Sequence, residues 1–300
     1  MQTVYPFLVR KHAVLQAERI KLHSTDDFVV VDVYNIHQPR TVIVSHGFES
    51  NSQGKSILGM AAYLLKHNFN VMAWNFRSCA PEGNNHIRCY HGGFTDDFPA
   101  LVTYAADVLK SKEIYLLGFS LGGNITLKWL GENNSELTNK ITKAVAISVP
   151  CDLEASSLKL ERKMNSFYKE RFLKTLRHKA ILRIPHFEST VSIEQVKSFK
   201  SLYEFDDKVF APLYGFKDAK DYHEKNSSKK FLHAIKIPTL ILSAKNDPFL
   251  TEECFPVEEC RANKNVFLEL PEHGGHVGFC MDRANGNYYS EKRAVKFFAS

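Results

Sequence analysis

The stretch Glu113-Ile-Tyr-Leu-Leu-Gly-Phe-Ser-Leu-Gly-Gly123 decides how the rest of the sequence is interpreted. Its first part, Glu113–Gly118, is an apolar run typical of a buried strand, and Leu121–Leu130 has the apolar spacing of a helix. Between them lies the pattern G-x-S-x-G, centred on Ser120, which is typical of a sharp strand-to-helix turn that exposes a serine hydroxyl. The glycines leave room for that turn. We therefore expect Ser120 at the edge of a sheet, at the positive end of the following helix.

Short apolar runs alternate with amphipathic stretches on both sides of this motif. Such alternation predicts the α/β class, with a mostly parallel central sheet covered by helices on both faces. The expected strands are Phe28–Tyr34, Arg40–Ser45, Asn70–Asn75, Glu113–Gly118, Lys143–Ser148, Pro238–Ser243 and Asn265–Leu270. The expected helices are Ser56–Lys66, Thr95–Leu109, Leu121–Leu130 and Tyr288–Phe298.

The alternation stops between residues 151 and 230. Asp152–Leu182 and Ser192–Tyr203 have helical patterns, and the sequence predicts no parallel strand there. This is typical of a helical insertion over the C-terminal edge of the strands, the edge at which ligands bind in open α/β sheets. We therefore expect residues 1–150 and 231–300 to form one core and residues 151–230 to form a helical cap.

A nucleophilic serine needs a base, and the base needs a carboxylate to orient it. In an α/β architecture of this kind the chain order is serine, then acid, then histidine, with the last two on loops after late strands. Asp247 follows the sixth expected strand, and His276 follows the seventh within a glycine-containing loop. Two alternatives remain open from the residues alone, Asp152 as the acid and His273 as the base.

The oxyanion of such a reaction needs two backbone N–H donors. Leu121, the residue after the serine, is expected to supply one. The loop Ser45–Ser50 follows an early strand and contains His46-Gly47, which makes the Phe48 amide the candidate for the other.

No cofactor or metal is expected. His273 and His276 lie three residues apart, but no third ligand stands near them in a metal-binding pattern. A dinucleotide fingerprint after the first strand and a P-loop are both missing. The formal charge of +6 is mildly basic, and without a nucleic-acid-binding motif it predicts no nucleic-acid partner.

The composition indicates an ordinary globular chain that works in the cytoplasm. Six cysteines are scattered without a metal-like spacing, which favours reduced thiols. No apolar run reaches the roughly 18 residues of a membrane span, and charges interrupt the N-terminal stretch where a secretion signal would need an apolar run. The sequence says nothing about the oligomeric state.

The stretch Lys159–Arg183 is strongly basic, with nine Lys or Arg residues against Glu161 and Glu170. Apolar residues interleave with these charges. Two interpretations follow: a cationic amphipathic lid that makes weak contact with an anionic lipid surface, or a solvated helical face above an apolar pocket. We favour the second.

Short motifs spread in order over most of the chain point to a known family. They are His46-Gly47, Asn75-Phe-Arg77, Tyr90-His91, Thr95, Asp97, Gly118–Asn124, Lys128–Glu132, Phe205–Asp207, Ala211-Pro212, Gly215-Phe216, Asp221-Tyr222, Ser227-Ser228, Ile237–Leu240, Asp247–Phe249 and His273–Phe279. With these motifs the sequence resembles the YheT-like group of α/β-hydrolases, which are similar to esterases and lipases. Two departures are the loop sequence His-Gly-Phe-Glu-Ser and Ser78, at a position where glycine is commoner in the group.

The resemblance implies that Ser120, Asp247 and His276 form a charge-relay set beneath the cap. The function that we expect is hydrolysis of a small-molecule ester, short-chain or monoacyl, through an acyl-enzyme on Ser120. A thioesterase, a phospholipase or an acylglycerol lipase with the same three residues is an alternative, and so is a non-catalytic ligand-binding protein of this fold.

Overall fold

A computed structural model describes residues 2–3, 10, 14–82, 89–132, 136–183, 191–282 and 287–300. An eight-stranded sheet forms the centre of the molecule, in the order β1-β2-β4-β3-β5-β6-β7-β8. Its strands are β1 (Glu18–Ser24), β2 (Asp27–Tyr34), β3 (Arg40–Ser45), β4 (Asn70–Trp74), β5 (Glu113–Phe119), β6 (Ile141–Ile147), β7 (Thr239–Leu242) and β8 (Val266–Glu269). The β1–β2 and β2–β4 pairs are antiparallel, and β4, β3, β5, β6, β7 and β8 run parallel. The predicted mostly parallel sheet is confirmed.

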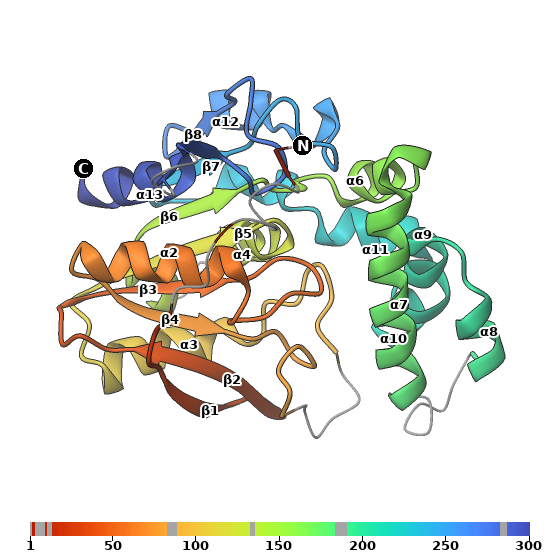
Figure 1. Cartoon of the computed structure of the whole chain (residues 1–300), viewed down its shortest axis with the longest axis horizontal. Coiled ribbons are helices and arrows are strands. Elements are labelled where there is room, and N and C mark those ends of the chain that lie inside the picture. Colours follow the sequence, from red (N-terminus) through yellow and green to blue (C-terminus); the bar gives the residue numbers. More distant parts are fainter. Residues whose placement is uncertain are drawn as a thin grey trace.

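Helices cover both faces of this sheet (Figure 1). Those packed on the core strands are α2 (Lys55–Lys66), α3 (Phe98–Thr103), α4 (Leu121–Glu132), α12 (Val257–Ala262) and α13 (Tyr289–Ala299), with the short α5 (Glu136–Asn139) before β6. Side chains of α3 and α4 share one buried cluster with alternate strand residues, and α2 and α13 share another. Val42 and Val44 of β3 face the second cluster while Ile43 faces the first, as the two-residue repeat of a strand requires.

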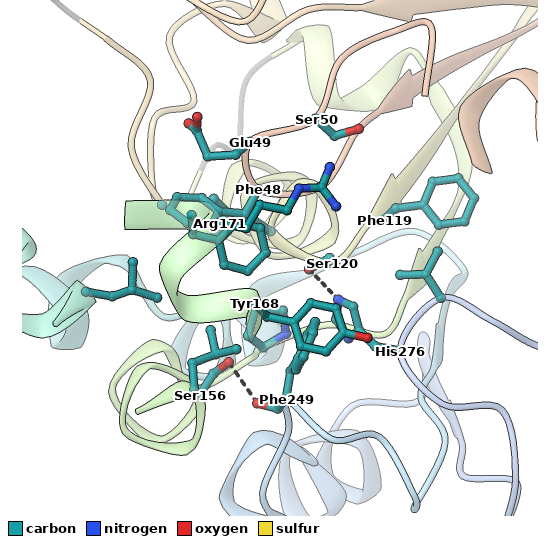
Figure 2. Close-up of a pocket in the computed structure, with 18 of the residues that line it drawn as sticks. Phe48, Glu49, Ser50, Phe119, Ser120, Ser156, Tyr168, Arg171, Phe249 and His276 are labelled. Atoms are coloured by element: carbon teal, nitrogen blue, oxygen red, sulfur yellow. Dashed lines mark hydrogen bonds between the residues drawn. The ribbon is translucent and has the colours of Figure 1, made fainter. Parts of the chain in front are cut away.

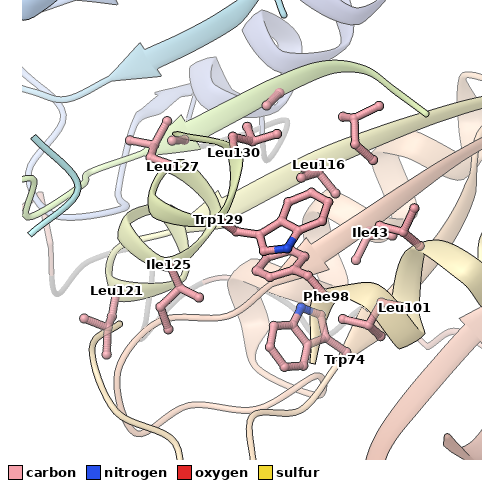
Figure 3. Packing of buried hydrophobic residues seen from close by; sticks show 14 of the residues in the cluster. Ile43, Trp74, Phe98, Leu101, Leu116, Leu121, Ile125, Leu127, Trp129 and Leu130 are labelled. Atoms are coloured by element: carbon pink, nitrogen blue, oxygen red, sulfur yellow. The ribbon is translucent and has the colours of Figure 1, made fainter. Parts of the chain in front are cut away.

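Aromatic rings fill the core on the face that α3 and α4 cover (Figure 3). Phe98 of α3 stacks on Trp129 of α4, with 4.8 Å between the ring centroids and 18° between the planes. Trp74 of β4 meets Phe98 edge-on at 5.6 Å. These contacts lock α4 against the sheet, and α4 is the helix that begins immediately after Ser120.

Residues 151–230, hereafter the cap segment, contain helices and no strand among their described residues. The helices are α6 (Leu153–Leu160), α7 (Ser166–Arg183), α8 (Ile193–Ser198), α9 (Leu202–Phe205), α10 (Ala211–Leu213) and α11 (Ala219–Asn226). They gather to the right of the sheet in Figure 1. Their apolar side chains form a third buried cluster of their own, which includes Leu173, Phe205 and Tyr222.

The basic stretch Lys159–Arg183 divides its apolar side chains between inside and outside. Leu176 is buried in the third cluster, with Leu160 and Phe172 packed against it. Met164 and Phe167 are 72% and 75% exposed. Contact of this stretch with a lipid surface stays a prediction. None of the described helices is both long and apolar enough to cross a bilayer.

Several predicted elements differ in detail from those observed. The expected helix Thr95–Leu109 begins at Phe98 and passes into a π-helical turn, Tyr104–Val108. The expected helix Asp152–Leu182 is two helices, because the chain bends and forms a 3-10 turn at Lys163–Asn165. Similarly, Ser192–Tyr203 is interrupted between α8 and α9, where Ser201 has an extended backbone.

The sequence did not predict the edge strand β1, the short helices α5, α10, α11 and α12, or a small hairpin of β9 (Cys280–Asp282) with β10 (Asn287–Tyr288). The six cysteines all lie in the described part of the chain, and no disulfide joins any two of them.

Candidate active site

Ser120 stands on a tight turn between β5 and α4. Its φ is +52°, a left-handed backbone conformation that residues other than glycine seldom adopt. The flanking glycines are required by space: a Cβ on Gly118 would lie 2.5 Å from the Gly122 carbonyl oxygen, and one on Gly122 would lie 2.3 Å from the His46 carbonyl oxygen. The turn therefore packs directly on the loop after β3, and the serine hydroxyl lies at the C-terminal edge of the sheet.

Ser120, His276 and Asp247 are linked by hydrogen bonds although they come from three separate loops. The His276 Nε2 atom lies 2.9 Å from Ser120 Oγ, and His276 Nδ1 lies 2.8 Å from Asp247 Oδ2. The Asp247 side chain is fully buried and that of His276 is 11% exposed. A buried carboxylate bonded to Nδ1 fixes the tautomer that leaves Nε2 free to accept the serine proton.

Neighbouring groups hold this series in place. The Phe249 amide donates a hydrogen bond to Asp247 Oδ1 at 2.9 Å, and the Phe249 ring lies 4.4 Å from the His276 ring. Asn246 accepts hydrogen bonds from two glycine amides just before His276, and the Val277 amide donates to Ser148 Oγ. The loop that carries His276 is thus held on both sides of the histidine. The sequence did not indicate these contacts beyond the position of Asn246 beside Asp247.

The two alternatives left open by the sequence lie elsewhere. Asp152 caps helix α6, where its side chain accepts a hydrogen bond from the Ala155 amide. His273 is exposed, and its Nδ1 lies 3.4 Å from the Asn246 side chain. His276 is the histidine that meets Ser120.

The loop after β3 lies beside the serine. A Cβ on Gly47 would lie 3.2 Å from Ser120 Cβ, so a larger residue there would crowd the serine. Neither the Phe48 amide nor the Leu121 amide donates a hydrogen bond to a described residue. The sequence predicted oxyanion donors at these two residues. Since neither N–H group has an acceptor in the described part of the chain, both are available to a ligand.

The His46 side chain stabilises the loop after β3 through two hydrogen bonds. It is fully buried; its Nε2 accepts a hydrogen bond from the Phe76 amide at 3.1 Å, and its Nδ1 donates to the Gly47 carbonyl at 2.7 Å. Burial lowers the pKa of His46 to about 3, so the ring stays neutral at ordinary pH. A neutral ring is the form that can accept one of these bonds while donating the other.

A cavity of about 480 Å³ opens above Ser120, between the sheet edge and the cap segment. Figure 2 shows Phe48, Tyr168 and Phe249 around the Ser120–His276 pair. Its size and mostly apolar walls are typical of a small-molecule pocket. The sequence did not indicate that Tyr168 of α7 would line this cavity with its ring against Phe249, because its part of the cap segment carries no local motif for such a position.

Comparison with known proteins shows to which family the chain belongs. The family model described as the alpha/beta hydrolase fold matches residues 40–280. The protein YheT of Escherichia coli (strain K12) is 31% identical over 93% of this chain, which corresponds to 83% of YheT. A monoacylglycerol lipase of Saccharomyces cerevisiae is 27% identical over 86% of this chain, and a phospholipase of Mus musculus is 29% identical over 80%. The chain spans only 59% and 58% of the length of these last two.

The similarity to a solved structure is evidence for the fold alone. The esterase Pf2001 of Pyrococcus furiosus superposes with a TM-score of 0.63 at 18% identity, covering 95% of this chain and 92% of its own. Together with the family match over most of the sequence and the identity to YheT, this likeness shows that the chain belongs to the α/β-hydrolases and, within them, to the group that includes YheT.

Proposed function

We propose that this chain is a serine hydrolase that cleaves carboxylic esters through an acyl-enzyme on Ser120. One observation carries the proposal: the hydrogen-bonded series Asp247–His276–Ser120 at the floor of an apolar cavity. The names of the relatives, a monoacylglycerol lipase and a phospholipase, and that of the superposed esterase support ester cleavage as the chemistry.

In the first half of the reaction His276 Nε2 takes the proton of Ser120 Oγ as that oxygen attacks the ester carbonyl carbon. Asp247 stabilises the imidazolium that forms. The carbonyl oxygen becomes an oxyanion and receives hydrogen bonds from the Phe48 and Leu121 amides. When the tetrahedral intermediate collapses, the C–O bond to the alcohol breaks, and the leaving oxygen takes the proton from His276.

In the second half a water molecule attacks the acyl-enzyme. His276 removes a proton from this water, the same two amides hold the second oxyanion, and Ser120 leaves with the proton returned by His276. The acid product departs and the starting state is restored. No step needs a metal or a cofactor, since the side chains and amides supply every proton transfer and charge contact.

The cap segment completes the site in this proposal. Residues 1–150 and 231–300 build the core that carries the nucleophile, base and acid, and residues 151–230 roof the cavity. Tyr168 and Phe172 of α7 and Leu153 of α6 supply apolar walls, which suits an ester with an apolar chain.

A fluorophosphonate probe tests the proposal directly. The wild-type protein should become labelled, and prior treatment with phenylmethanesulfonyl fluoride should prevent this. The Ser120→Ala variant should not label and should lose turnover of p-nitrophenyl butyrate by at least about 10³-fold. Ser56→Ala is the matched control, because Ser56 also lines the cavity but lies on α2.

Labelling that persists in Ser120→Ala would show a different nucleophile. A wild-type protein that neither labels nor cleaves any ester would favour the non-catalytic ligand-binding alternative. Comparing matched oxygen esters and thioesters of one acyl chain then decides between an esterase and a thioesterase.

A further inference from the structure

The end of the cavity beneath the cap segment carries polar side chains that the proposed reaction does not use. Asp206, His223 and Ser157 all line the cavity, together with apolar residues such as Leu202, Phe210 and Tyr222. They come from three elements: Ser157 from α6, Asp206 from the π-helical turn Asp206–Phe210, and His223 from α11.

Asp206 and His223 form a buried pair with one free position. The His223 Nε2 atom lies 2.8 Å from Asp206 Oδ2, and the His223 side chain is 3% exposed. Its Nδ1 has no hydrogen-bond partner among the described residues. When Nε2 donates to the carboxylate, the Nδ1 of the neutral ring keeps its lone pair and can accept a hydrogen bond.

Ser157 also lines the cavity, and its side chain is a second unsatisfied group. The residue is 8% exposed, and its Oγ lacks a partner within the described part of the chain. Five buried side-chain polar atoms are in this situation, and only those of His223 and Ser157 belong to residues that line the cavity. Leaving a buried polar group without a partner is costly, and native structures rarely do so without a ligand, an ion or a water molecule to meet it.

We propose that this end of the cavity binds a hydroxyl group of the substrate, so that the preferred esters carry a hydroxyl separated from the reacting carbonyl by an apolar chain. The hydroxyl hydrogen meets His223 Nδ1, and its oxygen accepts from the Ser157 hydroxyl. Asp206 holds the His223 ring in the orientation and tautomer that this requires. The inference rests on the proposed ester cleavage and specifies its substrate class.

A purely apolar pocket would produce the opposite preference. Moving a hydroxyl from water into an apolar wall without a hydrogen bond is unfavourable, so the hydroxylated ester would be the poorer substrate. A site built to bond a hydroxyl instead rejects the analogue that lacks it, because its own polar atoms are then left buried and unpaired. The sign of the preference therefore tests the proposal.

Two pairs of esters give the test, since the hydroxyl can reside on either side of the ester bond. Methyl 8-hydroxyoctanoate is compared with methyl octanoate, and 8-hydroxyoctyl acetate with octyl acetate. In at least one pair we expect the wild-type protein to favour the hydroxylated member about tenfold in kcat/KM. The pair that shows the preference tells which part of the substrate occupies the cap end.

Variants locate the effect. Ser157→Ala should reduce the preference several-fold without disturbing the fold, because the lost hydroxyl has no partner in the protein. His223→Phe should abolish it. Ser198→Ala is the matched control: the same substitution, in α8 of the cap segment and outside the cavity, should leave the preference unchanged.

Calorimetric titration of Ser120→Ala with the same four esters separates this inference from the proposed chemistry. Suppose that Ser120→Ala binds a hydroxylated ester more tightly than its apolar analogue, while the wild type cleaves none of the four esters. The proposed function would then be wrong and the inferred binding site would stand. Cleavage with a preference for the apolar member of both pairs, or a hydroxyl preference that survives both Ser157→Ala and His223→Phe, would overturn the inference.

Discussion

The Lys179 ammonium of helix α7 lies 2.9 Å from the Glu49 carboxylate, at the point where the cap segment meets the loop that carries Phe48. The Glu49 side chain is 3% exposed and that of Lys179 is 21% exposed. Although burial by itself would lower the pKa of Lys179, its neighbours Cys79 and Glu49 raise it above the ordinary value. Lys179 thus stays protonated, and its bond to Glu49 joins the cap segment to the candidate oxyanion loop.

Tyr90 strengthens this connection. Its hydroxyl donates to the Glu49 carboxylate at 2.8 Å and accepts from the Glu49 amide at 2.9 Å. Glu49 has a φ of +52°, so the chain turns sharply directly after Phe48. A side chain held from two directions keeps that turn in place.

We predict that Lys179→Met lowers both stability and activity. Removing one partner of a buried ion pair costs about 3–5 kcal/mol, and partial exposure of Lys179 reduces this to about 2–3 kcal/mol. Because the Glu49 turn adjoins Phe48, kcat/KM should fall about tenfold or more. Urea unfolding and ester turnover measure the two effects, and the double variant with Glu49→Gln should recover part of the stability.

Lys225→Met provides the matched control for this prediction. Lys225 also pairs with a carboxylate, that of Asp221 at 2.8 Å, but its side chain is 57% exposed. An exposed pair of this kind contributes little to stability, because water screens both charges. If Lys179→Met unfolded at the same urea concentration as Lys225→Met, the pair with Glu49 would have no role in stability.

We predict that Asp247→Asn folds normally and loses activity by about 10³- to 10⁴-fold. An amide in place of the carboxylate can donate its N–H group to His276 Nδ1. The neutral imidazole then carries its proton on Nε2, where it can no longer accept the proton of Ser120. Asp152→Asn is the control, because asparagine caps a helix as well as aspartate does. Turnover of p-nitrophenyl butyrate by the two variants should differ by three orders of magnitude or more. Equal loss in both would return Asp152 to consideration.

The sequence predicted most of the core because the relevant signals are local. Each parallel strand is an unbroken apolar run, and the residues after successive strands meet at one edge of the sheet. That rule predicts that Ser120, Asp247 and His276, which all follow strands, lie close together. The Gly47 loop lies beside the serine because β3 and β5 are neighbours in the sheet, an order that the sequence did not predict.

The features that were missed depend on contacts between distant residues. Strand β1 lies at the edge of the sheet with only Ile20 and Leu22 packed against the core, so its sequence Glu-Arg-Ile-Lys-Leu-His-Ser is mostly polar. Glu49 and Lys179 are 130 residues apart, and the sequence around each of them gives no indication that they form a pair. His223 and Asp206 are likewise brought together by the packing of α11, a short polar helix that carries no clear apolar pattern.

We predict that His276→Gln abolishes turnover while His273→Gln retains it within about twofold. Glutamine is close in size to histidine but cannot act as a base, so the first variant leaves Ser120 without a proton acceptor. His273 is exposed and has no contact with Ser120 or Asp247 among its described bonds. Initial rates on one ester, with the fold of each variant checked by circular dichroism, measure the difference. Substantial loss in His273→Gln would mean that this residue positions the loop.

Stability at acid pH should depend on His46. Burial lowers its pKa in the folded protein to about 3, whereas in the unfolded chain it is about 6.5. Between pH 6.5 and pH 3 His46 is protonated in the unfolded state and neutral in the folded state. The contribution of the neutral His46 to the free energy of unfolding is therefore complete above about pH 6.5 and is lost as the pH falls toward 3. The loss is about 1.4 kcal/mol for each pH unit well below 6.5.

Urea unfolding at pH 7 and pH 5 measures this contribution against the variant His46→Gln. The wild type should lose about 2 kcal/mol more than the variant between the two values, since the variant has no ring to protonate. Where the variant is too unstable to study, the NMR signals of the His46 ring in the wild type give a second measurement. They should remain those of a neutral imidazole down to about pH 4. A ring that titrates near 6.5 in the folded protein would show that His46 is not held between Gly47 and Phe76 as a neutral side chain.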